Sequence, residues 1–382
     1  MTVIQRCTVE RRSGLYVKSL DLKNFRNYES LSVSFDPGIN ILYGSNAQGK
    51  TNILEAVYLA GTTKSHRGTR DRDMIRMGEE ESHIRMIVDR NRNEYRIDVH
   101  LKKNRPKGVA LNGFPVKKAA DLYGITSLVF FSPEDLGIIK NGPSGRRRFL
   151  DLVLCSLDRV YLSDLTKYGK ILSQRNALLH EAAFDAKRIS EIDIWDMQLA
   201  ETGKKIIRKR AEFLEMFGRT ASEKHKLLTD GKENLEIIYE PNVPDNLMED
   251  KTQRNRDYDL RTRETHAGPH RDDLCIRVNG MDLRVYGSQG QQRTAAVSMK
   301  TAEIAVTEKI RNVSPVLLLD DVLSELDRDR QNALLGGISN TQTIITCTGL
   351  DDYIASSFQA NHIFRVSSGS VVDEASPIFP GC

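Results

Sequence analysis

The sequence predicts an α/β fold into which a helical domain is inserted, and three observations support this prediction. An apolar segment at residues 39–44 runs into a glycine-rich loop, and a helical pattern follows at 51–61. A second apolar segment at 316–319 ends in two aspartates, as a buried strand at the edge of a site does. Between these segments, residues 144–240 contain no proline and are rich in helix formers, which predicts a helical domain.

Composition limits which classes of protein fit this sequence. With 56 basic and 52 acidic residues among 382, the net charge is only +4, so local clusters must indicate any polyanionic partner. The chain is long enough for two or more domains, and no apolar run reaches the ~20 residues that span a bilayer. Residues 1–14 lack the apolar core of a signal peptide and are interpreted as a loose arm or an over-extended start. The cysteines are scattered, which disfavours a zinc or disulfide framework, so we expect a soluble cytoplasmic protein.

The stretch YGSNAQGKTN at residues 43–52 lies between the first expected strand and its helix. Gly44, Gly49, Lys50 and Thr51 fit the P-loop pattern G-x-x-x-x-G-K-[ST]. Glycines let the backbone approach a phosphate closely, and the helix N-terminus presents free amides to it. We therefore expect a phosphate site formed by Gly44, Ser45, Asn46, Ala47, Gln48, Gly49, Lys50 and Thr51.

Alternating apolar and polar residues predict an antiparallel sheet beside this loop. The segments 30–35 and 94–102 alternate as half-buried strands do, and Asn-Gly within 110–116 is typical of a tight hairpin turn. A second Asn-Gly hairpin is expected over 274–287. The polar segment 242–262 is interpreted as a loop or linker.

The two aspartates after the second apolar segment are candidates for metal chemistry. Carboxylates at the carboxyl end of a buried strand lie where ligands of open α/β sheets bind. Asp320 is expected to hold Mg²⁺, and Asp321 to orient or deprotonate the attacking water. The alternative is that both acids only cap the strand.

A second anion site is indicated at SQGQQR, residues 288–293. Ser288 and Gly290 precede a long amphipathic segment, so they are expected at a helix N-terminus. Because the P-loop already provides one phosphate site, this one can serve a nucleotide bound to another copy of the protein.

The motifs occur in the order G-x-x-x-x-G-K-T, S-x-G-Q, four apolar residues plus D-D, and S-E-L-D. This order resembles that of the ATP-binding-cassette family, and within it the branch that manages chromosomes and DNA breaks. Stretches that span nearly the whole chain are similar to RecF-like proteins of that branch: LKNFRNYESLSVSFDPGINILYGSNAQGKTNILEAVYLAG, FFSPEDL, RRRFLD, AGPHRDDL, GSQGQQRT and LLLDDVLSELD.

The resemblance implies an ABC-type P-loop ATPase head of the SMC/Rad50 kind with an inserted α-helical domain. The N-terminal lobe, with P-loop and antiparallel sheet, would occupy residues 15–143, and a helical domain of short paired helices 144–240. The C-terminal lobe, residues 241–382, would carry the signature motif, the acidic Walker B strand and the D-loop.

The resemblance also implies a dimer in which two heads sandwich two ATP molecules. Each ATP would lie between the P-loop of one subunit and Ser288, Gln289, Gly290 and Gln291 of the other. Lys50 and Asp321 would be the catalytic residues, and Thr51 and Asp320 the Mg²⁺ ligands. The D-loop, which crosses the dimer interface, would be Ser324, Glu325, Leu326 and Asp327.

ATPases of this branch act as ATP-gated clamps on DNA, and slow hydrolysis releases them. RecF-like proteins bind DNA at single-strand gaps and, with RecR and RecO, help to place RecA there. The resemblance therefore implies a weak, DNA-stimulated ATPase that serves replication, recombinational repair and the SOS damage response.

The chain departs from the wider family at three positions. Asp321 stands where many members carry glutamate, and a shorter side chain fits a slow ATPase. The loop at 132–137 lacks the expected metal-sensing glutamine, so Glu134 and Asp135 are its candidates. Thr346 and Thr348 stand near the expected switch histidine, and neither is assigned that role.

Three basic clusters are candidate DNA contacts, because clustered cations neutralise phosphates without reading bases. For each cluster, a solvated face or internal ion pairs is the alternative, and the arginines at 146–148 can instead pair with nearby acids. The candidates are Lys64, Arg67, Arg70, Arg72 and Arg76; Lys102, Lys103 and Arg105; and Arg146, Arg147 and Arg148.

Other classes of protein fit less well. In transport ATPase subunits the two nucleotide motifs lie much closer than Lys50 and Asp320 do here. A nuclease with a similar head needs an acid-rich metal domain, for which no room is expected after Asp320, and a nucleotide kinase would leave SQGQQR and SELD without a role. The isolated His66 and His270 do not indicate a metal site, and Trp195 is expected in the helical core.

Overall fold

The computed structural model describes residues 14–117, 119–122, 124–182, 184–336, 341–349 and 360–374. The expected arm at residues 1–14 therefore lies, apart from Gly14, outside the described residues. The chain forms two compact units, each built from separate segments. Unit 1 comprises Met1–Phe130, Val313–Leu318 and Asn340–Cys382, and unit 2 comprises Phe131–Asn312 and Leu319–Ser339.

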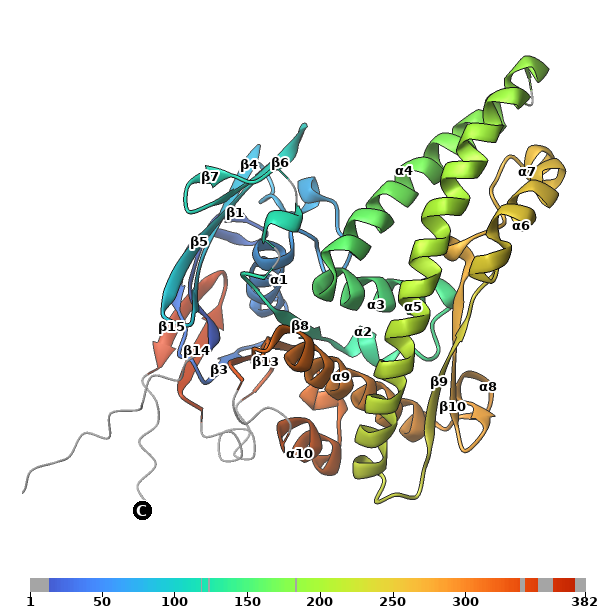
Figure 1. Ribbon diagram of the computed structural model, residues 1–382. Helices are drawn as coiled ribbons and strands as arrows, with labels where there is room; N and C mark the ends of the chain where they lie inside the picture. Colours follow the sequence, from blue (N-terminus) through green and yellow to red (C-terminus); the bar gives the residue numbers. More distant parts are fainter. Residues whose placement is uncertain are drawn as a thin grey trace, which may run out of the picture. The chain divides into compact units, whose positions relative to one another are not determined.

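Unit 1 contains an antiparallel sheet with the strand order β2-β1-β4-β5-β6-β7 (Figure 1). Along β4, exposed and buried residues alternate, so one face of the sheet carries the core and the other faces solvent. Asn112 and Gly113 both have positive φ, which confirms the predicted tight turn. The strands are β1 (Leu15–Phe25), β2 (Tyr28–Ser34), β4 (Glu81–Arg90), β5 (Asn93–Lys102), β6 (Arg105–Leu111) and β7 (Phe114–Pro115).

A second six-stranded sheet has the order β15-β14-β3-β13-β12-β8. Strands β13 and β14 both pair with β3 in parallel, and β15 closes one edge antiparallel to β14. The predicted buried strands are therefore confirmed and belong to one sheet. Its strands are β3 (Ile39–Tyr43), β8 (Leu128–Phe131), β12 (Val316–Asp320), β13 (Thr343–Cys347), β14 (His362–Ser367) and β15 (Ser370–Glu374).

Helix α1 (Lys50–Thr62) follows the P-loop, and its side chains belong to one apolar core with those of both sheets. Ile53, Leu54 and Val57 are fully buried, and each such burial stabilises the fold by about 1.5–3 kcal/mol. This core fixes the first turn of α1 and with it the end of the P-loop. Two short 3₁₀ helices, η1 (Asp71–Met74) and η2 (Ala119–Leu122), complete unit 1.

Unit 2 is built on long helices packed against a three-stranded sheet with the order β11-β10-β9. Helices α4 and α5 lie side by side (Figure 1), and α5 has 37 residues, longer than the short paired helices predicted. The main elements are α2 (Pro133–Leu136), α3 (Pro143–Leu157), α4 (Arg159–Ala182), η3 (Ala186–Glu191), α5 (Ile192–Leu228), β9 (Leu235–Glu240), β10 (Asp273–Val278), β11 (Met281–Asp282), α8 (Leu283–Tyr286) and α9 (Gln289–Arg311). Shorter elements of the unit include η5 (Pro269–Arg271), η6 (Leu323–Glu325) and α10 (Arg328–Gly336).

The interpretation of residues 242–262 as a loop or linker is wrong. They form η4 (Asp245–Leu247), α6 (Met248–Arg254) and α7 (Arg256–Thr262). Met248 is fully buried in a small core with Ala200 and Ile207 of α5, and Arg256 forms an ion pair with Asp196. Tertiary contacts therefore hold these polar helices, which are too short to be stable alone.

Two buried arginines tie the helices of unit 2 to its later segments. Arg175 of α4, with no exposed side-chain surface, pairs with Asp196 at 2.7 Å and with Asp259 at 2.8 Å. Arg210 of α5 pairs with Asp272 at 2.7 Å and with Asp151 at 2.8 Å. The helical segment 144–240 thus shares unit 2 with the signature helix α9 instead of forming a compact unit by itself.

Candidate nucleotide-binding site

The P-loop connects β3 to α1, and two of its glycines are required by the geometry. Gly44 has φ +153°, and a Cβ there would lie 2.2 Å from the carbonyl oxygen of Val366. Gly49 has φ +111°, and a Cβ there would lie 2.5 Å from Nδ2 of Asn27. Both positions therefore demand glycine, for backbone conformation and for space.

Lys50 is the first residue of α1 and only 6% exposed. Its Nζ donates hydrogen bonds to the carbonyl oxygens of Gly44 at 2.6 Å and Ser45 at 2.8 Å, so the ammonium lies inside the curve of the loop. An ammonium has three donors, which leaves one more for a ligand. The first turn of α1 contains no acidic residue, so the positive end of the helix is not neutralised.

Asn27, in the turn between β1 and β2, supports the loop from the side. Its Nδ2 donates to the carbonyl oxygen of Gln48 at 3.0 Å, and its Oδ1 accepts from Nδ2 of Asn52 at 2.8 Å. The side chain of Gln48 in turn accepts a hydrogen bond from the backbone of Ser368 at 2.6 Å. The sequence analysis missed Asn27, whose only signal was its place in the stretch LKNFRNY.

A buried ion pair fixes the same turn to α1. Arg26 donates to both oxygens of Glu55, at 2.9 and 3.1 Å, and Glu55 is 2% exposed. The hydroxyl of Ser65 donates to the same carboxylate at 3.1 Å. This pair therefore connects the turn before the P-loop, the helix after it and the start of the basic segment 64–76.

These residues fit a nucleoside triphosphate with Mg²⁺. The glycines allow a loop conformation that a Cβ would prevent, the backbone amides at the start of α1 are neutral donors, and Lys50 supplies a cationic donor. The hydroxyl of Tyr28 is buried near Gly49 and has no hydrogen-bond partner among the described residues. Thr51, half-buried in the first turn of α1, offers the hydroxyl that such sites use toward Mg²⁺.

The two aspartates follow a strand that is buried at all five positions, as the sequence predicts. Asp320 ends β12 and is 3% exposed. Asp321 has φ +51°, a conformation that costs a non-glycine residue energy and is found at functional sites. Its carbonyl oxygen accepts a hydrogen bond from the hydroxyl of Ser324 at 2.7 Å, which fixes the turn that leads into η6.

The signature segment, Ser288–Gln291, begins helix α9 as predicted. Ser288 is the N-cap: its Oγ accepts from the backbone of Gln291 at 3.2 Å, and the Gln291 side chain accepts from the backbone of Ser288 at 3.1 Å. Ser288 and Gln289 are exposed, and the first turn of α9 contains no acidic residue. The helix N-terminus is therefore open to an anion.

A buried histidine supports Gln291 through a shared carboxylate. Nε2 of Gln291 donates to one oxygen of Glu233 at 2.8 Å, and the other oxygen of Glu233 lies 3.1 Å from Nε2 of His225. His225 is fully buried on α5, and its Nδ1 lies 2.9 Å from the hydroxyl of Ser298. Burial lowers the pKa of His225, so the folded protein favours the neutral ring.

Two arginines connect α9 with the D-loop within unit 2. Arg293 donates to the carbonyl oxygen of Glu325 at 2.9 Å and to its carboxylate at 3.0 Å. Arg330 donates to the hydroxyl of Thr294 at 2.8 Å and to the carbonyl oxygen of Gly290 at 3.2 Å, and it also pairs with Asp327. The signature segment and the D-loop are therefore joined, and the sequence analysis assigned no role to either arginine.

The candidates for the metal-sensing and switch positions have structural roles. Asp135 accepts a hydrogen bond from the backbone of Ser132 at 2.8 Å and caps α2, and Glu134 is exposed beside it. Thr346 is buried within β13, whereas Thr348 is exposed just after that strand. No nucleotide-sensing role follows from these contacts.

Two of the basic clusters lie close together in unit 1. Lys107 of β6 pairs with Asp71 of η1 at 2.8 Å, which places the hairpin at 102–107 beside the segment 64–76. Some of their cations pair with acids, such as Lys103 with Glu80 at 2.8 Å. The exposed members of the two clusters are Lys64, Arg67, Arg70, Arg72 and Arg105, whereas Arg76, Lys102 and Lys103 are half-buried.

The third cluster is mostly committed to unit 2, as the alternative interpretation expects. Arg146 has a side chain 3% exposed and donates to both oxygens of Asp273, at 2.7 and 2.8 Å. Arg147 donates to the carbonyl oxygen of Asp272 at 2.7 Å. Because a buried, paired cation cannot reach a phosphate, we drop Arg146 as a DNA contact, and of the three only Arg148 is exposed.

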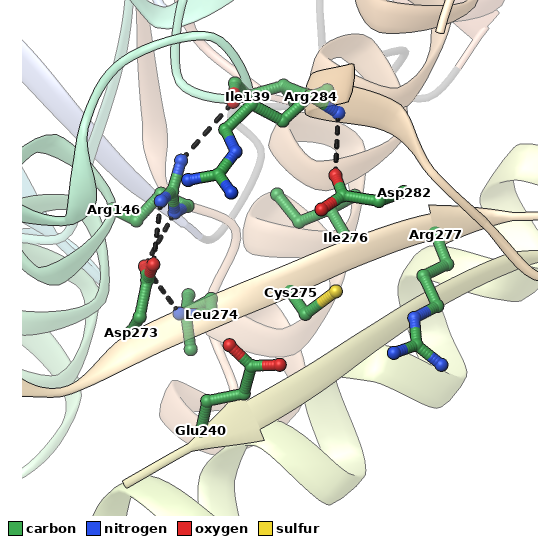
Figure 2. A pocket seen from close by; sticks show the side chains of 10 residues that line it. All are labelled: Ile139, Arg146, Glu240, Asp273, Leu274, Cys275, Ile276, Arg277, Asp282 and Arg284. Carbon is green, nitrogen blue, oxygen red and sulfur yellow. Dashed lines mark hydrogen bonds and ion pairs between the residues drawn. The ribbon is translucent and has the colours of Figure 1, made fainter. Parts of the chain in front are cut away.

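Arg146 and Asp273 line a hollow of about 230 Å³ in unit 2, beside β9 and β10 (Figure 2). Its lining mixes three arginines with three acids, and Cys275 lies among them. None of the residues predicted to bind ATP lines it. Its charges largely balance, so it offers no concentrated attraction for a triphosphate.

The residues that the sequence analysis discounted have ordinary structural contacts. The His66 ring stacks on Phe130 with centroids 4.0 Å apart. His270 lies 2.7 Å from the hydroxyl of Tyr168, and Trp195 packs half-buried against two apolar clusters of unit 2. Among the described residues, no helix combines the length and hydropathy that a membrane crossing requires.

The chain is similar to proteins of one known family. A family model described as the RecF/RecN/SMC N terminal domain matches residues 16–369. The DNA replication and repair protein RecF of Agathobacter rectalis is 55% identical over 362 residues, covering 94% of this chain and all of that protein. RecF of Lachnoclostridium phytofermentans is 52% identical, covering 94% of this chain and 99% of that protein.

The chain is also similar to solved structures. A structure of the recombination mediator protein RecF-ATP in the RecFOR pathway superposes with a TM-score of 0.88 at 35% identity, covering 96% of this chain and all of that one. The Smc head domain from Pyrococcus furiosus, bound to the C-terminal domain of ScpA, has a TM-score of 0.53 at 17% identity, over 94% of this chain and 96% of that one. The second likeness concerns the fold alone.

Proposed function

The chain belongs to the RecF family of DNA replication and repair proteins, and from that premise we propose that it is an ATP-dependent DNA-binding repair protein. In this proposal two copies close on DNA at single-strand gaps when ATP is bound, and slow hydrolysis reopens them. The observation that carries it is the presence in one chain of a P-loop and of a separate, exposed helix N-terminus joined to the D-loop.

The P-loop residues would bind the phosphates of ATP, with Lys50 neutralising the β- and γ-phosphates. Thr51 and Asp320 would hold Mg²⁺, which supplies charge neutralisation when bound. Asp321 would orient the attacking water. Its side chain is one methylene shorter than glutamate, which supports a weak ATPase, and we propose that DNA stimulates it.

The signature segment would complete the site of the partner subunit. Ser288, Gln289, Gly290 and Gln291 present an uncompensated helix N-terminus, which favours a phosphate group. Ser324, Glu325, Leu326 and Asp327 would cross the interface with it, because Arg293 and Arg330 join the two segments. The exposed apolar side chains of Val285 and Tyr286, just before the segment, favour an interface there.

The joined basic clusters of unit 1 would bind the DNA backbone, mainly through Lys64, Arg67, Arg70, Arg72 and Arg105, with Arg148 of unit 2 as a further candidate. The relatives' place in a RecFOR pathway supports RecR and RecO as protein partners and RecA loading as the outcome. On this basis the protein acts in the cytoplasm, in recombinational repair and the SOS response.

The test measures solution mass by light scattering, using Asp321→Asn to slow hydrolysis. With ATP and Mg²⁺ we expect this variant to dimerise, and without ATP to remain monomeric. Adding Ser288→Arg should raise the concentration needed for dimers at least tenfold and leave ATP binding intact. Ser190→Arg, at an exposed serine of η3, is the matched control. If Asp321→Asn alone binds ATP and stays monomeric, or if Ser288→Arg leaves dimerisation unchanged, the shared site is contradicted.

A further inference from the structure

Three side chains that the nucleotide site does not use meet on the solvent face of the antiparallel sheet in unit 1. Glu81 and His83 lie two residues apart on β4, at positions where the strand faces solvent. His100 lies on the neighbouring strand β5 (Figure 1), and the register pairs it directly with His83. Glu81 is paired in the same way with Lys102.

The ligand atoms of these side chains converge. Nε2 of His100 lies 3.1 Å from Oε2 of Glu81, and Nε2 of His83 lies 3.9 Å from Oε1 of the same carboxylate. All three ligand atoms lie within 4.8 Å of one another. A tetrahedral ion with bonds of about 2.1 Å needs donors about 3.4 Å apart. The donors are therefore near that spacing, and rotation of these side chains about their own bonds can bring them to it.

The arrangement of the two histidines is not that of a simple surface ion pair. Their rings stack with centroids 3.9 Å apart and 21° between planes, and both direct Nε2 at Glu81. An imidazole binds a metal ion in the plane of its ring, so the stacked rings must open before both Nε2 atoms can bind one ion. With the rings opened, the two nitrogens and the carboxylate of Glu81 can hold one divalent ion together.

Two neighbouring cations act against the binding of a metal ion here. Lys23, across from His83 on β1, and Lys102, 3.4 Å from Glu81, oppose a cation, and the half-exposed Lys102 can turn toward solvent.

The side of His100 away from His83 is open. Its register partner on β6 is Gly108, which has no side chain. A Cβ at Gly108 would lie 3.9 Å from the Cβ of His100, so the glycine leaves room beside the ring. The remaining coordination positions of an ion can therefore be filled by water.

We propose that Glu81, His83 and His100 form a binding site for a borderline divalent transition-metal ion, for which Zn²⁺ is the probe. Two imidazoles and one carboxylate are ligands that Zn²⁺ prefers, and the open side gives the fourth position to water. The ion joins β4 to β5. The proposal does not depend on the nucleotide site, which uses other residues.

The test titrates the full-length protein with ZnCl₂ calorimetrically, without nucleotide and with excess Mg²⁺ to occupy the acids of the nucleotide site. We expect one Zn²⁺ per chain. His83→Gln and His100→Gln should each weaken binding at least tenfold, whereas His180→Gln, at an exposed histidine of α4, should leave it unchanged. No stoichiometric uptake, or equal uptake by all variants, overturns the proposal.

A second variant tests the carboxylate arm. Lys102→Gln removes the cation that competes for Glu81, so it should tighten Zn²⁺ binding several-fold. Unchanged or weaker binding overturns Glu81 as a ligand. Replacing Zn²⁺ by Co²⁺ adds a spectroscopic check: a histidine and carboxylate site gives visible d–d bands without the strong near-ultraviolet absorption of thiolate ligands. That thiolate absorption would overturn the assignment in favour of cysteines.

Discussion

The P-loop of unit 1 and the signature segment of unit 2 both present a helix N-terminus to an anion, but they are held by different means. The P-loop is shaped by backbone: Gly44 and Gly49 adopt positive φ in spaces that exclude a Cβ. The signature segment is shaped by side chains: a capping box, the Glu233–His225 pair and Arg330 hold it. Replacing one glycine of the P-loop should therefore cause a large loss of ATP binding. Replacing one of the side chains that hold the signature segment should cause a smaller loss of dimerisation.

The largest expected effect is that of Gly49→Ala. The new Cβ would lie 2.5 Å from Nδ2 of Asn27, which must shift from its support of the loop, and alanine is strained at φ +111°. We expect ATP binding, measured by fluorescent nucleotide titration, to weaken by about 100-fold or more, or ~3 kcal/mol. Gly113→Ala in an exposed hairpin, with φ +87°, carries a similar backbone cost and should leave ATP binding unchanged. If Gly113→Ala weakened ATP binding as much as Gly49→Ala does, backbone strain alone would explain the loss, without any role for the geometry of the P-loop.

Arg330→Gln breaks the connection between α9 and the D-loop. We expect about tenfold weaker ATP-dependent dimerisation, because hydrogen bonds from a charged donor contribute about 1.5–3 kcal/mol when buried. Binding of ATP by the monomer should not change, since the P-loop lies in unit 1. Arg219→Gln, at an exposed arginine paired with Glu215 on the same helix, is the control in light scattering. A loss of monomer ATP binding would contradict the separation of roles.

Asn27→Ala removes a side-chain support from the backbone-built site. Its two hydrogen bonds, to Gln48 and from Asn52, are partly exposed, so each contributes about 1 kcal/mol or less. We expect ATP affinity to fall about fivefold, and Asn52→Ala to give a smaller loss because it removes one of the two bonds. A 100-fold loss would mean that the loop depends on side chains as much as on its glycines.

The smallest expected effect is a pH dependence of folding stability that comes from His225, which supports the signature segment. Burial lowers the pKa of His225, so the unfolded chain takes up a proton more readily below its ordinary pKa of about 6.5. The stability that neutral His225 contributes is therefore present above that pH and lost as the pH falls below it.

His225→Asn should make urea-unfolding stability less dependent on pH between 5 and 7, by about 1 kcal/mol or less. The quantity to compare between His225→Asn and the unsubstituted protein is the slope of unfolding free energy against pH, because the substitution also alters buried hydrogen bonds at every pH. His180→Gln should leave the slope unchanged, and an unaltered slope in His225→Asn would contradict the burial argument.

The same contrast explains what the sequence predicted. The P-loop, the buried strand that ends at Asp320 and the cap at Ser288 are local patterns, and the structure confirms each as a structural feature. The hydrogen bonds from Asn27 to Gln48 and from Arg330 to Gly290 join residues 21 and 40 positions apart, and no local spacing predicts them. The helices at 248–262 escaped prediction because packing against α5, not propensity, holds them.

The histidine cluster was missed for a further physical reason. His83 and His100 are 17 residues apart, so neither shows a ligand partner at helical or alternating spacing. Only the register of β4 and β5 brings them together, and a shift of one residue would move one ring to the buried face. Register depends on the whole sheet, including the Asn91-Arg92 turn, which lacks the usual glycine.

The buried arginines of unit 2 have a consequence for protein engineering. A fragment cut at residues 144–240 would keep Arg175 with Asp196 and Arg210 with Asp151, but each arginine would lose its second carboxylate, Asp259 or Asp272, at 2.8 or 2.7 Å. Breaking a buried ion pair costs up to about 3–5 kcal/mol, a large part of the stability of a typical domain. The helical segment 144–240 therefore cannot be exchanged between proteins by itself. A chimaera that transplants it must also include the residues up to Asp272.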